Sequence, residues 1–562
     1  MILKKSQDIF EPLLTTYFDN ILLLGGKEVE FTGASILLTP VKQNQYKPVK
    51  SDRELEKWAQ SILIDGLGAK ITINASWFGE HQLFYYADDS NALISSSFDT
   101  VVSFLRSRNI SLELDEVAIC ESLVFEHPLR TRTFCRQIRK IMLGKKIEIS
   151  LKPVSVRSTI SYNLRFSDTD ECPNENELID RATEILSELI TPKIRSMLEE
   201  QKVLLLLSGG VDSRLIGSLL KRSKIPFECI TFGPWESADP YVAKKVAAEL
   251  GVGIDHLLLE DADYKLYGDE VTKLSGGFSF HMHCHVYAVL KKNDIRSDFI
   301  LHGNLAERSC ASSKGLPVGD RSTKDKAMDN VLMHKSNVRR IWGLLNNTIK
   351  SEILNDLWET MDECASVNHP MHFYDYFSKV ESNSALYSAI FNVVQPFGTP
   401  FSIYANHDYQ DFFCFLPLKY REEKYLFKKA CMKMFPQEFA IGTSEEIFAH
   451  QSLLCPLERS LSKALNIFSF GAFVFSGGRL WIPNPKNYER HRKVLFGVLK
   501  NDFRDAVEFA GKILDTDLSS FIKTSYANRT EIETQFRILS FLTIAKNFKF
   551  FEGSKTKRLE DE

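Results

Sequence analysis

The stretch from Val203 to Lys221 decides the fold and reads VLLLLSGGVDSRLIGSLLK. Five apolar residues come first, the hexapeptide SGGVDS (208–213) follows, and apolar residues then recur at helical spacing. This order predicts a buried strand, a glycine-rich loop and a helix. Because ligands of open parallel sheets bind beyond the carboxyl ends of the strands, the loop lies where a site is expected.

The residue types of the loop predict an anion site that includes a metal ion. Gly209 and Gly210 allow backbone N–H groups to approach a ligand closely, and the start of the helix adds further donors. Ser208 and Ser213 add hydroxyl groups. Asp212 fits an anion site only if a divalent cation lies between its carboxylate and the anion, and phosphate oxygens with a carboxylate commonly hold Mg²⁺.

Strands and helices alternate after this loop. Strands are expected at FECITFG (227–233), IDHLLLE (254–260) and FILHG (299–303). A helix is expected over DPYVAKKVAAELG (239–251), with Gly251 closing it. The alternation predicts an α/β fold with a doubly wound parallel sheet, and the chain from about residue 337 is expected to be mostly helical.

The first 155 residues are rich in predicted strands, and they differ from the rest of the chain. Strands are expected at KITINASWF (70–78), QLFYYA (82–87) and NALISSS (91–97), and helices over 99–108 and 114–125, the second with Asp115 as N-cap. A polar stretch over 165–177 has the composition of a linker. We therefore expect domains over 1–165 and 178–480, followed by a helical extension over 481–562.

Composition sets limits on the class of protein. The chain has 562 residues, so two or more domains are expected. Its net charge of −3 gives no general case for binding nucleic acid or an anionic membrane. No apolar run is long enough to span a bilayer, and the first residues do not resemble a signal peptide. The ten scattered cysteines, with no CxxC pair, indicate free thiols in a reducing cytoplasm.

The hexapeptide SGGVDS resembles the S-G-G-x-D-S signature of the PP-loop of N-type ATP pyrophosphatases, which cleave ATP between the α and β phosphates. Several further stretches are similar to the asparagine synthetase family. They are SADPYVAKKVAAELG (237–251), FILHGNLAERS (299–309), VVQPFGTPFSIYANHDYQDFF (393–413) and FLPLKYREEKYLFKKACMKMFPQEF (415–439). Residues 77–105 and 114–150 resemble the second half of that family's glutaminase-type domain.

The resemblance implies an N-terminal αββα amidohydrolase-like (Ntn-type) domain and a PP-loop synthetase domain that uses ATP and Mg²⁺. It implies that a substrate carboxylate is adenylated with release of pyrophosphate, and that ammonia or an amine then displaces AMP. Asp212 and Glu307 match the family's metal ligands, and Ser208, Gly209, Gly210 and Ser213 its pyrophosphate loop. The adenosine pocket falls at the ends of two strands, on Leu206, Thr231, Phe232 and Gly233.

The sequence departs from the family at three places. Ile2 stands where a glutaminase needs its N-terminal cysteine, so no glutamine hydrolysis is expected. Asn304 replaces an acidic residue and cannot act as a base, whereas Arg308, next to Glu307, is expected to contact pyrophosphate. Asn304 and Arg308 are therefore the catalytic candidates. The family's lysine after the proline-containing turn is absent from 439–451, and Lys433 and Arg459 are the nearest cations in sequence.

Histidines form a second group of polar residues. His281, His283 and His285 alternate, but an apolar helical pattern follows directly. We expect a helix start at which the three imidazoles point in different directions, rather than a zinc site. His302 and Asn304, just after a strand, are better candidates for a substrate pocket. The basic stretch 489–500 is expected to be a solvated helix face rather than an RNA contact.

The function predicted from these features is ATP-dependent formation of an amide bond by a ligase or amidotransferase of the asparagine synthase type. Asparagine biosynthesis is the family's main reaction. A specialised relative that closes a lactam or an isopeptide bond, similar to β-lactam synthetases or lasso cyclases, is favoured by Ile2. The expected partners are a small-molecule or peptide carboxylate and an ammonia or amine donor, without nucleic acid or membrane, and a homodimer is possible.

Two alternatives remain open. The first is a nucleotide-binding protein that has kept the loop and lost turnover, which the absent lysine and Asn304 favour. The second is a tRNA-modifying PP-loop enzyme. The near-neutral charge and the lack of paired zinc-binding cysteines weaken this second alternative.

Overall fold

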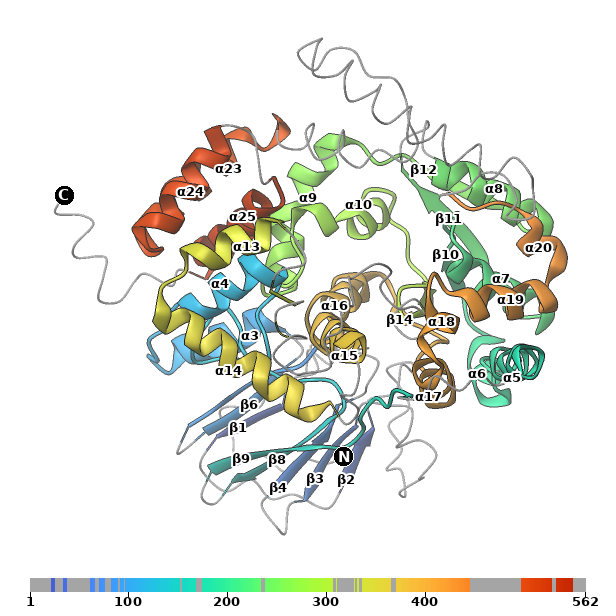
Figure 1. Ribbon diagram of the computed structural model, residues 1–562, viewed down its shortest axis with the longest axis horizontal. Coiled ribbons are helices and arrows are strands. Elements are labelled where there is room, and N and C mark those ends of the chain that lie inside the picture. The colour runs from blue at the N-terminus through green and yellow to red at the C-terminus, as the bar shows by residue number, and fades with distance from the viewer. Residues whose placement is uncertain are drawn as a thin grey trace.

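The computed structural model shows an α/β protein with one parallel sheet, two antiparallel sheets and many helices (Figure 1). It describes residues 22–25, 34–37, 61–65, 70–75, 82–88, 91–95, 97–151, 154–167, 174–233, 238–306, 310, 328, 331–332, 336–364, 370–444, 497–527 and 532–548.

The parallel sheet contains the predicted strands in a doubly wound order. Its strands are β10 (Val203–Leu206), β11 (Glu228–Phe232), β12 (Ile254–Leu257), β13 (Phe299–Leu301) and β14 (Thr399–Phe401). They lie in the order β12-β11-β10-β13-β14, and every neighbouring pair is parallel. The strand order reverses between β10 and β13, so the topological switch point lies beside the glycine-rich loop.

The edge strand β14 was not predicted from the sequence. It has only three residues and contains Pro400, which is tolerated at an edge because it lacks a backbone donor. Gly398 precedes it, and a Cβ atom there would lie 2.3 Å from the carbonyl oxygen of Ser297. The chain therefore approaches the sheet too closely at this point for any larger residue.

Helices connect these strands and cover the sheet. The connecting elements are α7 (Val211–Arg222), α8 (Ala238–Leu250), α9 (Asp261–Leu274), the 3₁₀ turn η1 (His281–His283) and α10 (His285–Lys292). Gly251 ends α8 with a φ of +71°, as predicted. Val203 and Leu205 of β10 belong to one hydrophobic cluster and Leu204 to another, so β10 is buried on both faces.

The N-terminal part forms two antiparallel sheets. One has the order β1-β6-β5-β7 and the other β2-β3-β4-β8-β9. Their strands are β1 (Leu22–Gly25), β2 (Ala34–Leu37), β3 (Ser61–Asp65), β4 (Lys70–Asn74), β5 (Phe84–Ala87), β6 (Asn91–Ser95), β7 (Arg139–Lys140), β8 (Lys145–Leu151) and β9 (Val154–Ile160). A cluster that includes Ile73, Ile94 and Ile149 draws on strands of both sheets.

Two helices, α3 (Phe98–Ser107) and α4 (Glu116–Phe125), belong to this N-terminal part. Asp115 caps α4 by accepting hydrogen bonds from the N–H groups of Val117 and Ala118, both at 3.1 Å, which confirms the predicted cap.

Further helices and helical turns precede the C-terminal part. They are α5 (Glu175–Ser187), α6 (Pro192–Leu198), α13 (Ser336–Leu344), α14 (Asn347–Glu363), α15 (Pro370–Ser382), the π-helical turn η2 (Asn383–Tyr387), α16 (Ser388–Val394), the turn η3 (Gln395–Phe397), α17 (His407–Phe415), α18 (Leu418–Arg421), α19 (Tyr425–Met434) and α20 (Pro436–Ala440).

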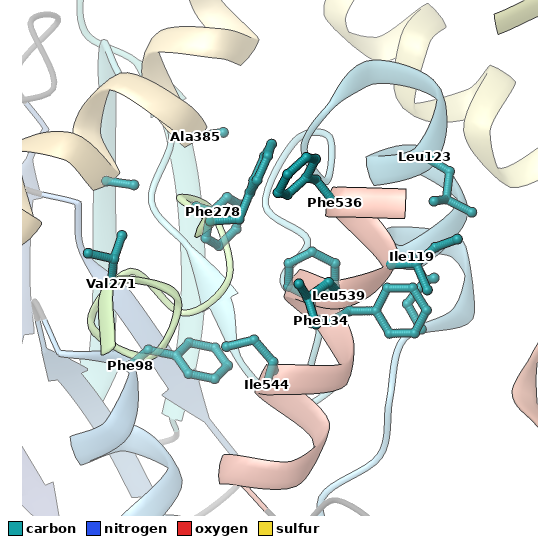
Figure 2. Close-up of a cluster of buried hydrophobic side chains, with 14 of the residues drawn as sticks. Phe98, Ile119, Leu123, Phe134, Val271, Phe278, Ala385, Phe536, Leu539 and Ile544 are labelled. Carbon is teal, nitrogen blue, oxygen red and sulfur yellow. The ribbon is translucent and has the colours of Figure 1, made fainter. Parts of the chain in front are cut away.

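Three C-terminal helices complete the fold, namely α23 (Lys500–Ile513), α24 (Thr516–Ala527) and α25 (Ile532–Asn547). Helix α25 packs against α4 and α9 (Figure 2), where Phe536 and Ile544 join one cluster with Phe134 and Phe278. Gly277 has a φ of +89°, and a Cβ atom there would lie 2.7 Å from the Phe134 ring. The chain thus turns closely around this aromatic cluster.

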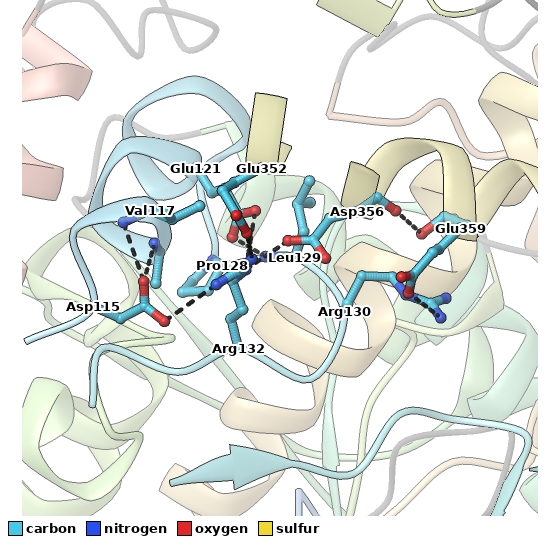
Figure 3. A network of polar contacts seen from close by, with 12 residues as sticks. Asp115, Val117, Glu121, Pro128, Leu129, Arg130, Arg132, Glu352, Asp356 and Glu359 are labelled. Carbon is cyan, nitrogen blue, oxygen red and sulfur yellow. Dashed lines mark hydrogen bonds and ion pairs between the residues drawn. The ribbon is translucent and has the colours of Figure 1, made fainter. Parts of the chain in front are cut away.

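Charged side chains join the N-terminal part to α14 (Figure 3). Arg132 lies within 4 Å of four carboxylates, those of Asp115, Glu121, Glu352 and Asp356. The Arg132 Nε atom is 2.5 Å from Asp356. Burial alone would lower the pKa of Arg132, but the hydrogen bond and charge of Asp356 raise it above its ordinary value.

In the part of the chain that the structure describes, no helix is both long and apolar enough to cross a membrane. Eight cysteines fall within that part, and all of them are buried free thiols.

Candidate nucleotide-binding site

The SGGVDS loop leaves β10 and enters α7 at the carboxyl edge of the sheet. The N–H of Ser208 donates to Ser213 Oγ at 3.0 Å, and the two hydroxyl oxygens are 2.9 Å apart. The N–H of Gly210 donates to Ser208 Oγ at 3.2 Å. Gly210 is the N-cap of α7, and no side chain caps this helix. The positive end of the α7 dipole therefore faces the loop without a side-chain cap, which favours an anion there.

Gly209 is fixed by groups behind the loop. Its N–H donates to Asp239 Oδ1 at 3.0 Å, so it is already bonded rather than directed at an anion, contrary to the expectation from the sequence. A Cβ atom on Gly209 would lie 3.0 Å from Val242 Cβ and 3.1 Å from Ser444 Cβ. Gly209 is thus a glycine because α8 and Ser444 pack closely against it.

The loop after β13 meets the loop after β10. A Cβ atom on Gly303 would lie 2.9 Å from both Asp212 Cβ and the Ser213 nitrogen. Tyr404 reaches the same point and donates its hydroxyl to the carbonyl oxygen of Asp212 at 2.7 Å. The two strands that flank the switch point therefore bring Asp212 and Gly303 together, as the doubly wound order requires.

A lysine that sequence reasoning missed enters this site. Lys424 Nζ lies 2.6 Å from Asp212 Oδ2, and both side chains are largely buried. Lys424 precedes α19 with a φ of +59°, and Glu423 before it has a φ of +50°. Two consecutive left-handed residues aim the side chain in a direction that helical periodicity does not predict. The stretch KYLFKKACMK (424–433) also contains several lysines, and the sequence alone does not show which of them enters the site.

The cations that the sequence suggested do not take this place in the described structure. Lys433 pairs with Asp180 of α5. That pairing is an exposed contact away from the loop, so Lys433 does not replace the family's lysine in this site. Arg308, Arg459 and the predicted metal ligand Glu307 lie outside the described residues.

The other predicted residues gather at the same edge of the sheet. Leu206 pairs with Ile230, so the ends of β10 and β11 lie side by side and bring Leu206 close to Thr231. Phe232 lies with its ring centroid 5.7 Å from that of His285. Gly233 follows β11 directly, and its N–H donates to the carbonyl oxygen of Leu257 at 3.2 Å.

His302 and Asn304 follow β13. The N–H of Asn304 lies 3.4 Å from His302 Nδ1, and burial lowers the pKa of His302 to about 4. The His302 imidazole is therefore neutral at physiological pH. Asn304 and His302 lie on either side of Gly303, and so beside the Asp212 end of the loop.

The three alternating histidines have separate surroundings at a helix start, as predicted. His281 Nε2 lies 3.1 Å from Asp269 Oδ1, whereas the His285 ring lies against Phe232. Burial lowers the pKa of His283 to about 4. Among the described residues, no group of three or more histidine, cysteine or acidic side chains is placed to hold a metal ion.

The described donors nevertheless suit a magnesium ion that is bound together with a nucleotide. Mg²⁺ is usually held by one or two carboxylates and substrate phosphates rather than by a complete protein cage. Asp212 supplies one carboxylate at the edge of the loop, next to the uncapped start of α7. The donor set therefore fits Mg²⁺ with phosphate and does not fit a metal bound by protein groups alone.

The fold and this loop define a class of protein, a doubly wound α/β protein with a nucleotide loop at its switch point. The comparison with protein families narrows the class. Residues 188–292 match the family described as asparagine synthase, and this segment covers α7 to α10 with the loop itself. This part of the chain is therefore similar to the asparagine synthase family. A search of curated proteins finds no match to the chain.

Proposed function

We propose that this protein is an ATP-dependent synthetase that activates a carboxylate by adenylation and then forms an amide bond with ammonia or an amine. The observation that carries the proposal is the meeting of the SGGVDS loop with Gly303 at the switch point, where Asp212 faces the end of β13. The family match over 188–292 supports an ATP-dependent, amide-forming ligase at the coarser level.

The loop residues are proposed to bind the pyrophosphate half of ATP. The hydroxyls of Ser208 and Ser213 and the first N–H groups of α7 are the donors in this proposal. Asp212 holds Mg²⁺ together with phosphate oxygens, and the ion, when bound, neutralises the charge on the leaving pyrophosphate. Lys424 lies 2.6 Å from Asp212, close enough to add a second positive charge at the same phosphates.

In the proposed reaction, an oxygen of the substrate carboxylate forms a bond to the α-phosphorus, and the bond from that phosphorus to the bridging oxygen breaks as pyrophosphate leaves. The nitrogen nucleophile then bonds to the acyl carbon, loses a proton, and displaces AMP. Asn304 cannot take that proton, so its proposed role is to orient the substrate through its amide. Leu206, Thr231, Phe232 and Gly233 are proposed to border the adenosine.

A second candidate function is nucleotide binding without turnover, which the amide of Asn304 in place of a carboxylate favours. The two functions differ in their products. The protein would be incubated with Mg-ATP, a pool of amino-acid and peptide carboxylates, and ammonium. Release of AMP and pyrophosphate in equal amounts supports the synthetase. Tight binding of Mg-ATP with no release of AMP supports the binding protein, and release of ADP and phosphate contradicts both.

A further inference from the structure

Arg214, directly after the last serine of the loop, is a buried charged side chain, with 1% of its surface exposed. Its guanidinium donates only to backbone carbonyl oxygens. Nη1 contacts those of Glu438 at 3.2 Å and Ile441 at 2.6 Å, and Nη2 contacts those of Gly209 at 3.2 Å and Gly442 at 2.7 Å. One side chain therefore joins the nucleotide loop to the turn that follows α20.

The charge on Arg214 is not neutralised by a carboxylate in the described part of the chain, where no acidic group lies within 4 Å of its guanidinium. Burial lowers the pKa of Arg214 to about 10, and the charge of Cys431 opposes this shift only in part. A buried cation without a counter-charge is costly, and an anion bound nearby would recover part of that cost. The nearest site built for an anion is the loop itself.

Residues 438–444 close over Gly209 through contacts besides those of Arg214. The N–H of Ser444 donates to the carbonyl oxygen of Gly209 at 3.3 Å. The Ser444 side chain also hydrogen-bonds to Asp239, which accepts the N–H of Gly209. The Phe439 ring centroid lies 5.5 Å from the guanidinium carbon of Arg214. The segment 438–444 is thus packed against the back and side of the nucleotide loop.

The positive charge reaches the front of the loop through one peptide group. The carbonyl of Gly209 and the N–H of Gly210 belong to the same peptide, so a cation at the oxygen polarises the N–H. Gly210 is the N-cap of α7, and its N–H donates to Ser208 Oγ, which is bonded in turn to Ser213 Oγ. Arg214 can therefore strengthen the donors that face a phosphate without touching the phosphate.

We infer that Arg214 is a positioning residue for pyrophosphate, which holds residues 438–444 as the outer wall of the site and polarises the Gly209–Gly210 peptide. The inference rests on the function proposed above and assigns a role to a residue that the family resemblance did not single out. The family resemblance predicts a lysine in this segment, but the sequence has Thr443 and Ser444 there instead. The buried cation Arg214 lies behind the loop, in addition to Lys424 beside Asp212.

The test uses Arg214→Lys, which keeps the charge but cannot reach four carbonyl oxygens. Arg222→Lys is the matched control, because Arg222 also lies on α7 and over a phenylalanine ring, Phe435, but at the far end of the helix. Amide hydrogen exchange of residues 438–444 would be measured without ligand, and binding of inorganic pyrophosphate with Mg²⁺ by calorimetry. We expect Arg214→Lys to speed exchange in 438–444 and to weaken pyrophosphate binding about tenfold, and Arg222→Lys to do neither.

The outcomes separate the inference from the proposed function. Faster exchange with unchanged pyrophosphate affinity would overturn the inference and leave the synthetase standing. If the wild-type protein does not bind Mg-pyrophosphate, the proposed function falls and the inference falls with it. If Arg214→Lys does not fold, hydrogen exchange of the wild-type protein with and without pyrophosphate tests the inference. Pyrophosphate should then slow exchange in 438–444 together with 208–213, and protection of 208–213 alone would overturn the inference.

Discussion

Two arginines of this protein, the partly buried Arg132 and the fully buried Arg214, have opposite surroundings. Arg132, between α4 and α14, lies within 4 Å of four carboxylates, and Asp356, Glu121 and Asp115 among them raise its pKa despite partial burial. Arg214, behind the nucleotide loop, donates to four carbonyl oxygens, and burial lowers its pKa to about 10. The first charge is neutralised inside the protein, whereas we infer that the second favours an anion bound at the loop. Internal charge balance therefore separates a structural ion network from a proposed anion site.

The largest expected effect is on stability, at the neutralised arginine. Arg132→Met leaves the carboxylates of Asp115, Glu121 and Asp356 buried without their cation. Breaking a buried ion network in this way typically costs about 3–5 kcal/mol in the free energy of unfolding. Urea unfolding followed by circular dichroism measures it.

The control for this prediction is Arg136→Met. Arg136 pairs with Glu113 at 3.5 Å, and both side chains are more than half exposed. Exposed pairs contribute about 0–1 kcal/mol, so this variant should stay close to the wild type. Equal losses in the two variants would show that the carboxylate network around Arg132 has no special structural role.

The next effect concerns the site rather than stability. Lys424→Met removes the ammonium group 2.6 Å from Asp212. Loss of one group that stabilises transition-state charge commonly lowers the rate by about a hundred- to thousandfold. We expect a fall of that size in kcat for AMP release, measured under conditions in which circular dichroism shows the variant to be folded.

Lys433→Met is the matched control for Lys424→Met, because Lys433 lies on the adjacent helix and pairs with Asp180 instead. Its rate should stay close to that of the wild type. If Lys433→Met loses as much activity as Lys424→Met, the assignment of Lys424 to the phosphates is wrong.

The smallest expected effect is on the pH dependence of stability, and it comes from Glu121, which lies beside Arg132. Burial, followed by the charge of Asp356, raises the pKa of Glu121 well above its ordinary value. The folded state then binds a proton more tightly than the unfolded state. This contribution to stability is full at pH below the unfolded pKa and is lost as pH rises through the folded pKa.

Glu121→Gln mimics the protonated acid and should remove that dependence. Glu121 Oε2 accepts the N–H of Leu129 at 2.8 Å, a bond that the amide oxygen of glutamine can keep. Between pH 5 and pH 8, the stability of the wild type should therefore fall relative to that of the variant. Parallel stability curves for the two proteins over this range would contradict the raised pKa.

The sequence predicted the strands around the loop because their apolar runs and the hexapeptide SGGVDS are local features. It also predicted the Asp115 cap and the Gly251 end of α8, which depend on one residue each. Lys424 was missed because two consecutive left-handed residues direct it, and β14 was missed because it is three residues long and contains a proline.

The role of Arg214 was missed for a different reason. Three of its four partners are carbonyl oxygens of residues more than 220 positions away, as with Glu438 and Gly442. Every residue has a backbone carbonyl oxygen, so the sequence does not mark these partners. In the same way, the bond from Gly209 to Asp239 depends on how α8 packs against the loop. Such tertiary contacts leave no periodicity or motif in the sequence.

The central claim is that the site adenylates a carboxylate, and exchange of radioactive pyrophosphate into ATP tests it most directly. The exchange would be measured with Mg²⁺ and a pool of amino-acid and peptide carboxylates, for the wild type and for Asp212→Asn. We predict exchange by the wild type and a fall of at least about a hundredfold in the variant, because the carboxylate that holds Mg²⁺ is lost. Exchange that survives Asp212→Asn, or a wild type that binds Mg-ATP without any exchange, would contradict the claim.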